Sequence, residues 1–167
     1  MMERREFLLA SGRLVTVVVL AGVAGCKGEP KSGPVDVKFD RDSCDYCRMI
    51  ITDPRFASQI RGGPKHKTFN FDDIGDAVLF LDEQPWKGEA DIEFFVMDVE
   101  TGKTWLDARK AHFLTDQVSP MAFGFGAVAD PRPGAIDFAE MSKRVIEAGS
   151  PHLCDHDPAD VAQGVQR

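Results

Sequence analysis

The sequence has fewer basic residues than nucleic-acid-binding proteins need. It carries 20 lysine and arginine residues against 27 aspartate and glutamate residues, so its formal net charge is −7. Such a chain lacks the basic surface that releases counterions from a phosphate backbone. After residue 25 it also lacks any apolar run approaching the roughly 20 residues that span a membrane. We therefore expect an acidic domain that binds no nucleic acid.

Motifs of the common enzyme classes are also missing. The sequence contains no Ser-His-Asp arrangement, phosphate-binding loop or dinucleotide fingerprint. Its most notable carboxylate pair is Asp72-Asp73, and acidic residues at the start of a helix are favourable without any catalytic role. We do not expect an enzyme.

The first 25 residues have the pattern of an export signal. Basic residues at Arg4, Arg5 and Arg13 precede an apolar stretch, residues 14–24, that is too short to span a membrane. Residues 4–8 also resemble a twin-arginine signal, so the general secretory and twin-arginine routes both stay open.

Residues 23–26, Val-Ala-Gly-Cys, resemble a bacterial lipobox, in which Cys26 is lipidated. A plain signal followed by an incidental cysteine is the alternative. Residues 27–34 are rich in glycine, proline and lysine, as expected of a linker. We expect a protein outside the cytoplasm, anchored to the membrane by the lipid on Cys26 and on the periplasmic side in a Gram-negative cell. Thiols are not kept reduced there.

Hydrophobic patterning after residue 34 predicts an α+β fold. Strands are predicted at residues 35–39, 56–61, 67–71, 92–99, 104–106 and 124–129, with a helix opened by Asp72 and Asp73 and another at 136–148. Residues 108–114 fit a short strand or a helical turn. Two strand-and-helix units, about 35–88 and 89–149, suggest an internal duplication. The inward side of the second helix is predicted to hold Phe138, Met141, Val145 and Ile146. Residues 150–167 are expected to form a loosely ordered tail.

The residues that point to a chemistry are sulfur donors. Cys44 and Cys47 lie with Met49 in the six-residue segment Cys-Asp-Tyr-Cys-Arg-Met, and Met121 lies in the segment Ser-Pro-Met-Ala-Phe-Gly. Thiolates and thioethers are soft ligands that select Cu(I), whereas thiolates alone also suit zinc. A disulfide between the two cysteines and a core role for each methionine remain alternatives.

A second group of donors lies near the C-terminus at His152, Cys154 and His156. These residues are a possible accessory metal site. A zinc site that joins Cys44 and Cys47 to Cys154 and His156 is another possibility, and a solvated tail is a third.

In their order and spacing, the segments C-D-Y-C-R-M, F-D-D-I-G-D and S-P-M-A-F-G behind a lipobox resemble NosL, the copper-binding lipoprotein that accompanies nitrous oxide reductase. The resemblance covers about residues 26–149. It implies a monomeric Cu(I) carrier of two ββαβ-like units, related in fold to the organomercury lyase MerB. Its partner would be a copper-receiving protein of the nitrous oxide reductase maturation complex. The implied sulfur ligands are Cys47, Met49 and Met121, with Cys44 beside them, and no catalytic residue is implied.

One position departs from the family pattern. Arg48 stands where the family usually has glycine. If that glycine serves a positive φ, Arg48 strains the loop. A cation beside the thiols is also expected to lower their pKa values.

Two other functions compete with the copper carrier. The first is a thiol/disulfide redox lipoprotein that uses Cys44 and Cys47. Redox proteins of the thioredoxin kind place a Cys-x-x-Cys motif at the start of a helix. Residues 49–54 here are rich in β-branched residues and end in proline, which makes a helix after Cys47 unfavourable. The second, an enzyme of the mercury-lyase kind, is suggested by shared fold alone, which does not carry function. The sequence therefore favours the copper carrier.

Overall fold

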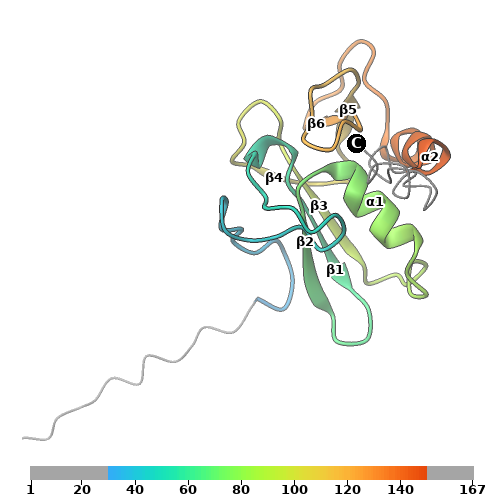
Figure 1. Ribbon diagram of the computed structural model, residues 1–167. Helices are drawn as coiled ribbons and strands as arrows, with labels where there is room; N and C mark the ends of the chain where they lie inside the picture. Colours follow the sequence, from blue (N-terminus) through green and yellow to red (C-terminus); the bar gives the residue numbers. More distant parts are fainter. Residues whose placement is uncertain (1–29, 150–167) are drawn as a thin grey trace, which may run out of the picture.

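The computed structural model describes residues 30–149, which form two antiparallel sheets and two α-helices (Figure 1). In chain order, the elements are the 3-10 helix η1 (Pro54–Phe56), β1 (Ser58–Gly62), β2 (Lys67–Phe71), α1 (Ile74–Asp82), β3 (Glu93–Met97), β4 (Trp105–Asp107), β5 (His112–Leu114), β6 (Gly126–Val128) and α2 (Phe138–Ala148). The predicted α+β class is confirmed. Within these residues, neither helix combines the length and apolar character needed to cross a membrane.

The larger sheet has the strand order β2-β1-β3-β4. Ile60 of the central strand β1 lies opposite Phe69 of β2 and Phe94 of β3. All five residues of β1 are buried. Helix α1 contacts β1 and β2, and the side chain of Gln59 on β1 is bonded to the backbone of Val35. Because side chains alternate between the two faces of a strand, both faces of β1 are covered.

The strand predicted at residues 35–39 does not form. The Val35 N–H donates to Gln59 Oε1 (3.0 Å), and the Val35 carbonyl accepts from Gln59 Nε2 (2.9 Å). A side chain thus takes the backbone groups that a neighbouring strand would pair. The apolar residues of the alternating pattern, Val37 and Phe39, pack against the core instead.

Helix α1 begins where the sequence predicts. Asp73 is its N-cap, and the Asp73 side chain accepts a hydrogen bond from the N–H of Gly75 (3.0 Å). Such a cap satisfies one of the backbone donors that the first turn leaves unpaired. This end of α1 directly follows β2, so the helix returns across the sheet from a fixed point.

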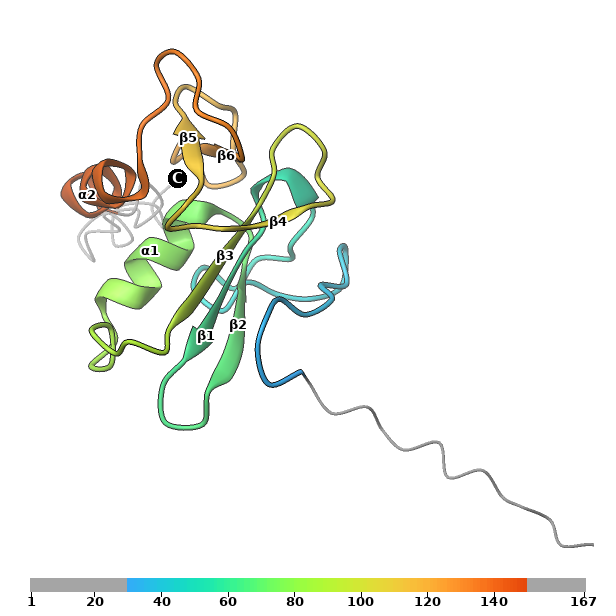
Figure 2. The same ribbon diagram turned by 180° about the vertical axis from the view of Figure 1, so that it is seen from behind.

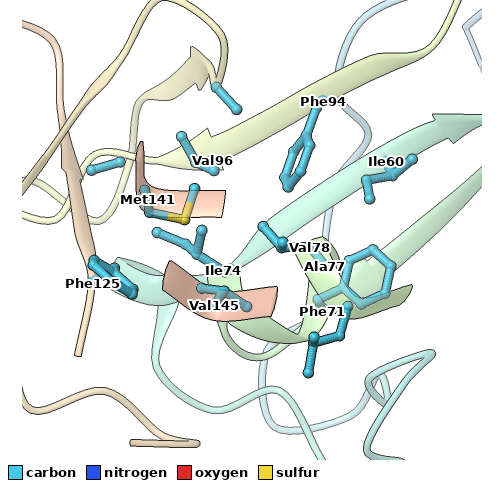
Figure 3. Close-up of a cluster of buried hydrophobic side chains, with 14 of the residues drawn as sticks. Ile60, Phe71, Ile74, Ala77, Val78, Phe94, Val96, Phe125, Met141 and Val145 are labelled. Atoms are coloured by element: carbon cyan, nitrogen blue, oxygen red, sulfur yellow. The ribbon is translucent and has the colours of Figure 1, made fainter. Parts of the chain in front are cut away.

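The core lies where α1, α2 and the larger sheet meet (Figure 3). Met141 and Val145 of α2 are fully buried there, and each such side chain stabilises the fold by about 1.5–3 kcal/mol. Ile146 was predicted to point inward, but it is 45% exposed. The next residue along a helix is rotated by about 100°, which moves Ile146 off the buried side.

The two predicted units share one sheet. It takes β1 and β2 from residues 35–88 and β3 and β4 from residues 89–149. Residues 108–114 contain a strand, β5, which pairs with β6. A bridge between Asp98 and Ala127 links this small sheet to the chain beyond β3. Figure 2 shows the small sheet at the end of the molecule opposite the β1–β2 turn. The internal duplication and the ββαβ form stay predictions.

Candidate metal centre

The segment that holds the two cysteines, residues 44–49, is a closed turn that we call the Cys loop. The Cys44 N–H donates to the Met49 carbonyl (2.8 Å), and the Arg48 N–H donates to the Cys44 carbonyl (3.2 Å). Asp45 fastens the loop to Asn70 of β2 by two bonds of 2.8 Å, one from its N–H and one to its carboxylate. The loop is therefore held beside the end of β2 by its backbone.

Arg48 has a φ of +69°, as expected if the glycine of the family pattern serves a left-handed turn. For a residue with a Cβ, that conformation costs about 1–2 kcal/mol because of steric crowding. The expected lowering of the thiol pKa values is wrong, however. Both thiols have raised pKa values, because burial and a neighbouring carboxylate outweigh the exposed Arg48 side chain.

The Cys loop brings both thiols to one carboxylate on α1. The Cys44 thiol donates to Asp76 Oδ2 (3.2 Å), and both residues are 0% exposed. The ligand atoms of Cys44, Cys47 and Asp76 all lie within 4.8 Å of one another. Both cysteines are free thiols. These three residues are a group that can hold a metal ion.

One atom of this group is left without a partner in the described part of the chain. Asp76 Oδ1 is buried and accepts no hydrogen bond. A buried carboxylate oxygen in this state costs about 1–3 kcal/mol or more. Such an oxygen beside two thiols suits a site that exchanges protons for a cation, so the donor set fits a metal.

Burial is the main cause of the thiol pKa shifts. It raises the pKa of Cys44, and the negative charge of Asp76 adds to the shift. Burial also raises the pKa of Cys47 well above its usual range, again with a contribution from Asp76. In the metal-free state both thiols therefore keep their protons at neutral pH, which explains how two sulfurs and a carboxylate coexist in so little space.

Backbone N–H groups partly oppose this shift at the Cys44 sulfur. The amides of Asp72, Tyr46 and Cys47 bond to it and lower its pKa. N–H donors stabilise a thiolate. The surroundings of Cys44 therefore suit an ionised sulfur better than burial alone would allow.

Asp76 is the member of the group that the sequence analysis missed. Its pKa is raised, chiefly by burial, and the charges of Asp73 and Asp72 act in the same direction. A signal was available in the sequence. Asp76 is followed by Ala77, Val78 and Leu79 on a helix whose first turns face the core, and an unpaired charge is rare at such a position.

Asp73 links the same helix to the second sulfur segment, residues 118–124, which we call the Met loop. Asp73 Oδ2 accepts from the N–H of Met121 (3.1 Å), and the Ser119 side chain bonds to the same carboxylate. The Phe123 ring lies so close to Gly75 that a Cβ there would come within 2.1 Å of it. Asp73 and Gly75 thus hold the Met loop at the N-terminus of α1, one helical turn before Asp76.

The structure places the two methionines differently. Met121 is 4% exposed, in the Met loop beside the start of α1. Met49 is 55% exposed, although its N–H bonds to the Cys47 sulfur. The structure thus joins Cys44 and Cys47 to Asp76. Whether either methionine is a metal ligand stays a prediction.

Four sequence-predicted residues lie outside the described residues 30–149. They are Cys26, the predicted lipidation site, and the possible accessory ligands His152, Cys154 and His156. The zinc site that would use Cys154 and His156 stays a prediction for the same reason.

Comparison with solved structures gives a distant neighbour. No family model and no curated protein matches this chain. Among solved structures, the crystal structure of the copper chaperone NosL from Shewanella denitrificans is similar, with 20% sequence identity and a TM-score of 0.49 over 72% of this chain and 89% of that one. We infer what this chain binds from its own side chains.

Replacing Asp76 by asparagine is expected to stabilise the metal-free protein at pH 7 by about 1 kcal/mol, as relief of a functional-site cost often does. The raised pKa means that the folded state holds the Asp76 proton more tightly than the unfolded chain. Stability is therefore lost as pH rises from the ordinary value of 3.8 through the folded pKa. Thermal unfolding of reduced, metal-free protein should show the gain of D76N at pH 7 and little gain below pH 3.8.

The control for this prediction is D82N, on the same helix. Asp82 is partly exposed and pairs with Lys87 (2.7 Å), so its replacement should change stability by less than about 1 kcal/mol. A D76N protein that is no more stable than the wild type at pH 7 would show that the Asp76 charge costs nothing in the fold.

Proposed function

We propose that this chain is an exported, lipid-anchored protein that binds Cu(I) as cargo and passes it to a copper-receiving partner, in the manner of the NosL proteins that serve nitrous oxide reductase. The observation that carries the proposal is the group of two free thiols facing Asp76, with all donor atoms within 4.8 Å of one another. We also propose, from the sequence, that the lipid on Cys26 anchors the protein, that the protein lies outside the cytoplasm and that it has a copper-receiving partner.

The donor set favours Cu(I) because its two nearest sulfurs are soft ligands. Cu(I) binds thiolate and thioether sulfur readily, and carboxylate oxygen is a harder donor that suits other metals. Cys44 and Cys47 are therefore the primary ligands. Met121 and Met49 supply thioethers from the Met loop and the Cys loop. Asp76 lies behind the sulfurs as a hydrogen-bond acceptor.

Exposure at the site suits a carrier better than a permanent metal centre. Cys44 is fully buried, Cys47 is partly exposed and Met49 is largely exposed. The two cysteines thus form a path from the interior to the surface within one loop. A partner that offers its own sulfur ligands at Cys47 has access to the ion without unfolding this chain.

The thiol/disulfide redox function fits the structure less well. Redox-active cysteines have lowered pKa values and lie at helix N-termini or beside cations. Here the pKa values of Cys44 and Cys47 are both raised. The loop that holds them leads to the η1 turn at Pro54, with no α-helix in between. Two protonated thiols are poor nucleophiles but become good ligands when a metal displaces their protons.

The test is a Cu(I) titration of residues 27–167 under reducing, anaerobic conditions, with a competing chelator and Zn(II) as the control metal. Tight one-to-one binding that survives excess Zn(II) is the expected result. Preference for Zn(II) would indicate a zinc site built from the thiols and Asp76. The absence of tight binding to either metal would exclude the carrier.

Replacing Met121 by leucine tests the thioether. We expect Cu(I) affinity to fall by about tenfold or more, since even residues behind a metal ligand contribute 10–100-fold, while the reaction of the two thiols with a thiol reagent stays unchanged. M141L is the matched control, because Met141 is a buried core methionine of α2. Exchanges of methionine for leucine in cores usually cost less than about 1.5 kcal/mol. Unchanged affinity in M121L would remove Met121 from the site.

A further inference from the structure

The two ends of the larger sheet carry different chemistry. At one end is the β1–β2 turn, between Gly62 and Lys67, and at the other end Ser58 pairs with Phe71. Phe71 is followed by Asp72, whose N–H bonds to the Cys44 sulfur. A five-residue strand separates its ends by about 14 Å. The thiols therefore lie at the end of the sheet that is remote from the turn.

The N-terminal segment is fastened to the turn end. The buried Arg61 donates to the carbonyl of Pro30 (2.7 Å) and to that of Gly33 (3.1 Å). Glu93 accepts from the N–H of Gly33 (3.1 Å) and from the hydroxyl of Ser32 (2.5 Å), and it lies 3.5 Å from Arg61. The chain thus enters the fold through a fixed point on β1 and β3.

Unpaired lysines gather around this entry point. A hollow of about 400 Å³ is lined by Pro30, Lys31, Arg61, Lys65 and His66. Lys31, Lys65 and Lys67 are exposed, and none forms an ion pair within residues 30–149. Lys67 Nζ lies 4.8 Å from the centre of the Phe69 ring, a contact that leaves its charge in place. Arg61 is paired with Glu93 and His66 with Asp91. The three lysines, which we call the lysine edge, therefore keep their charge for an external anion.

The predicted anchor lies close to the lysine edge. This inference rests on the lipidation of Cys26 proposed above. Cys26 precedes Pro30 by four positions, and four residues extend at most about 14 Å. A lipid on Cys26 therefore holds Pro30 within that distance of the membrane, so the neighbouring lysine edge can reach the surface. Lysines within about 10 Å of the surface interact favourably with anionic headgroups.

We propose that the lysine edge binds anionic phospholipid headgroups and orients the domain so that the β1–β2 turn faces the membrane and the thiols face away from it. Both views of the fold show the turn at one end and β5 and β6 at the other (Figures 1 and 2). The net charge of −7 repels the rest of the molecule from an anionic surface. The Cys loop is then open to a partner on the side remote from the membrane.

The two tryptophans report this orientation, since the sequence contains no others. The indole of Trp86 lies against Gly62 and Gly63 at the turn, whereas Trp105 pairs with Met97 at the far end of the sheet. The full lipidated chain would be reconstituted in phosphatidylcholine–phosphatidylglycerol vesicles that contain a headgroup spin-labelled lipid. In the W105F variant, all tryptophan fluorescence comes from Trp86, so its quenching by the spin label is measured alone. The difference between the quenching of the wild type and that of W105F gives the contribution of Trp105. We expect Trp86 to be quenched at least about twofold more than Trp105, because the sheet ends lie about 14 Å apart.

The charge is tested in the same vesicles. In the W105F background, K65E/K67E should reduce the quenching of Trp86. K103E should not, because Lys103 lies in the β3–β4 turn at the far end. Equal quenching of the two tryptophans, or equal effects of K65E/K67E and K103E, would overturn the orientation. Flotation with neutral phosphatidylcholine vesicles tests the anchor without the headgroup charge. If C26A floats with them as well as the wild type, Cys26 is not the anchor and the orientation falls with it, whereas the prediction of Cu(I) binding is unaffected.

Discussion

Replacing Cys47 by serine lowers the affinity for Cu(I) by on the order of a hundredfold or more, because residues that only support a ligand already contribute 10–100-fold. Serine keeps the size of the side chain and removes the soft donor. Cys47 is partly exposed, so the fold should tolerate the change. The same replacement at Cys44 removes the buried sulfur that receives three backbone N–H groups. The double variant should bind no Cu(I) against a strong competing chelator.

Thermal unfolding of the metal-free variants checks that the loss arises at the site. Y46F is the matched control within the Cys loop. It removes the hydroxyl that bonds to Glu83 (3.1 Å) and leaves both sulfurs in place. Its affinity should stay within a few-fold of the wild type. A C47S protein that binds Cu(I) as tightly as Y46F does would mean that Cys47 is not a ligand.

Cu(I) affinity rises steeply with pH. The raised pKa values of Cys44 and Cys47 keep both thiols protonated at neutral pH, and Cu(I) binds the thiolates, so binding releases protons. If both protons reach the solvent, the logarithm of the apparent association constant increases by about two per pH unit. If Asp76 takes up one of them, the slope is about one. Titrations from pH 6 to pH 8, corrected for the titration of the chelator, give the slope.

The variant D76N separates these two cases. Asparagine retains an oxygen acceptor for the Cys44 thiol but takes up no proton, so a wild-type slope near one should become a slope near two. C47S, with a single thiol left of the pair, should have a slope about one lower than that of the wild type in either case. Binding that does not depend on pH over this range would show that the thiols are already ionised, against the pKa shifts that burial causes.

Local patterns sufficed for much of the fold. The strand predicted at 67–71 is β2 (Lys67–Phe71), and the acidic pair at Asp72-Asp73 does open a helix. Both depend on interactions between residues a few positions apart. The strand predicted at 35–39 was wrong because its alternation is equally that of an extended segment lying on a sheet, where Gln59 takes the backbone bonds of Val35.

The two cysteines of the group were visible in the sequence because their spacing is local. The positive φ at Arg48 was an expectation conditional on the role of the glycine in the family pattern. The sequence marks Asp76 as an acidic residue on the core side of a helix, but it does not show which residues Asp76 faces. Asp76 and Cys44 are 32 positions apart in the sequence. They come into contact because α1 packs back over β2. Nothing in the spacing of the cysteines indicates which buried residue of a later helix faces them.

The sequence by itself determined the kinds of donor, the helix that opens at Asp73 and the α+β class, because residue chemistry and short-range periodicity decide these features. Only the tertiary structure decided that Cys44 and Cys47 share the carboxylate of Asp76 and that their pKa values are raised. Both outcomes depend on burial, which arises when the Cys loop, the Met loop and α1 pack together. The pairing of β1 with β2 separates the lysine edge from the thiols by the length of a strand.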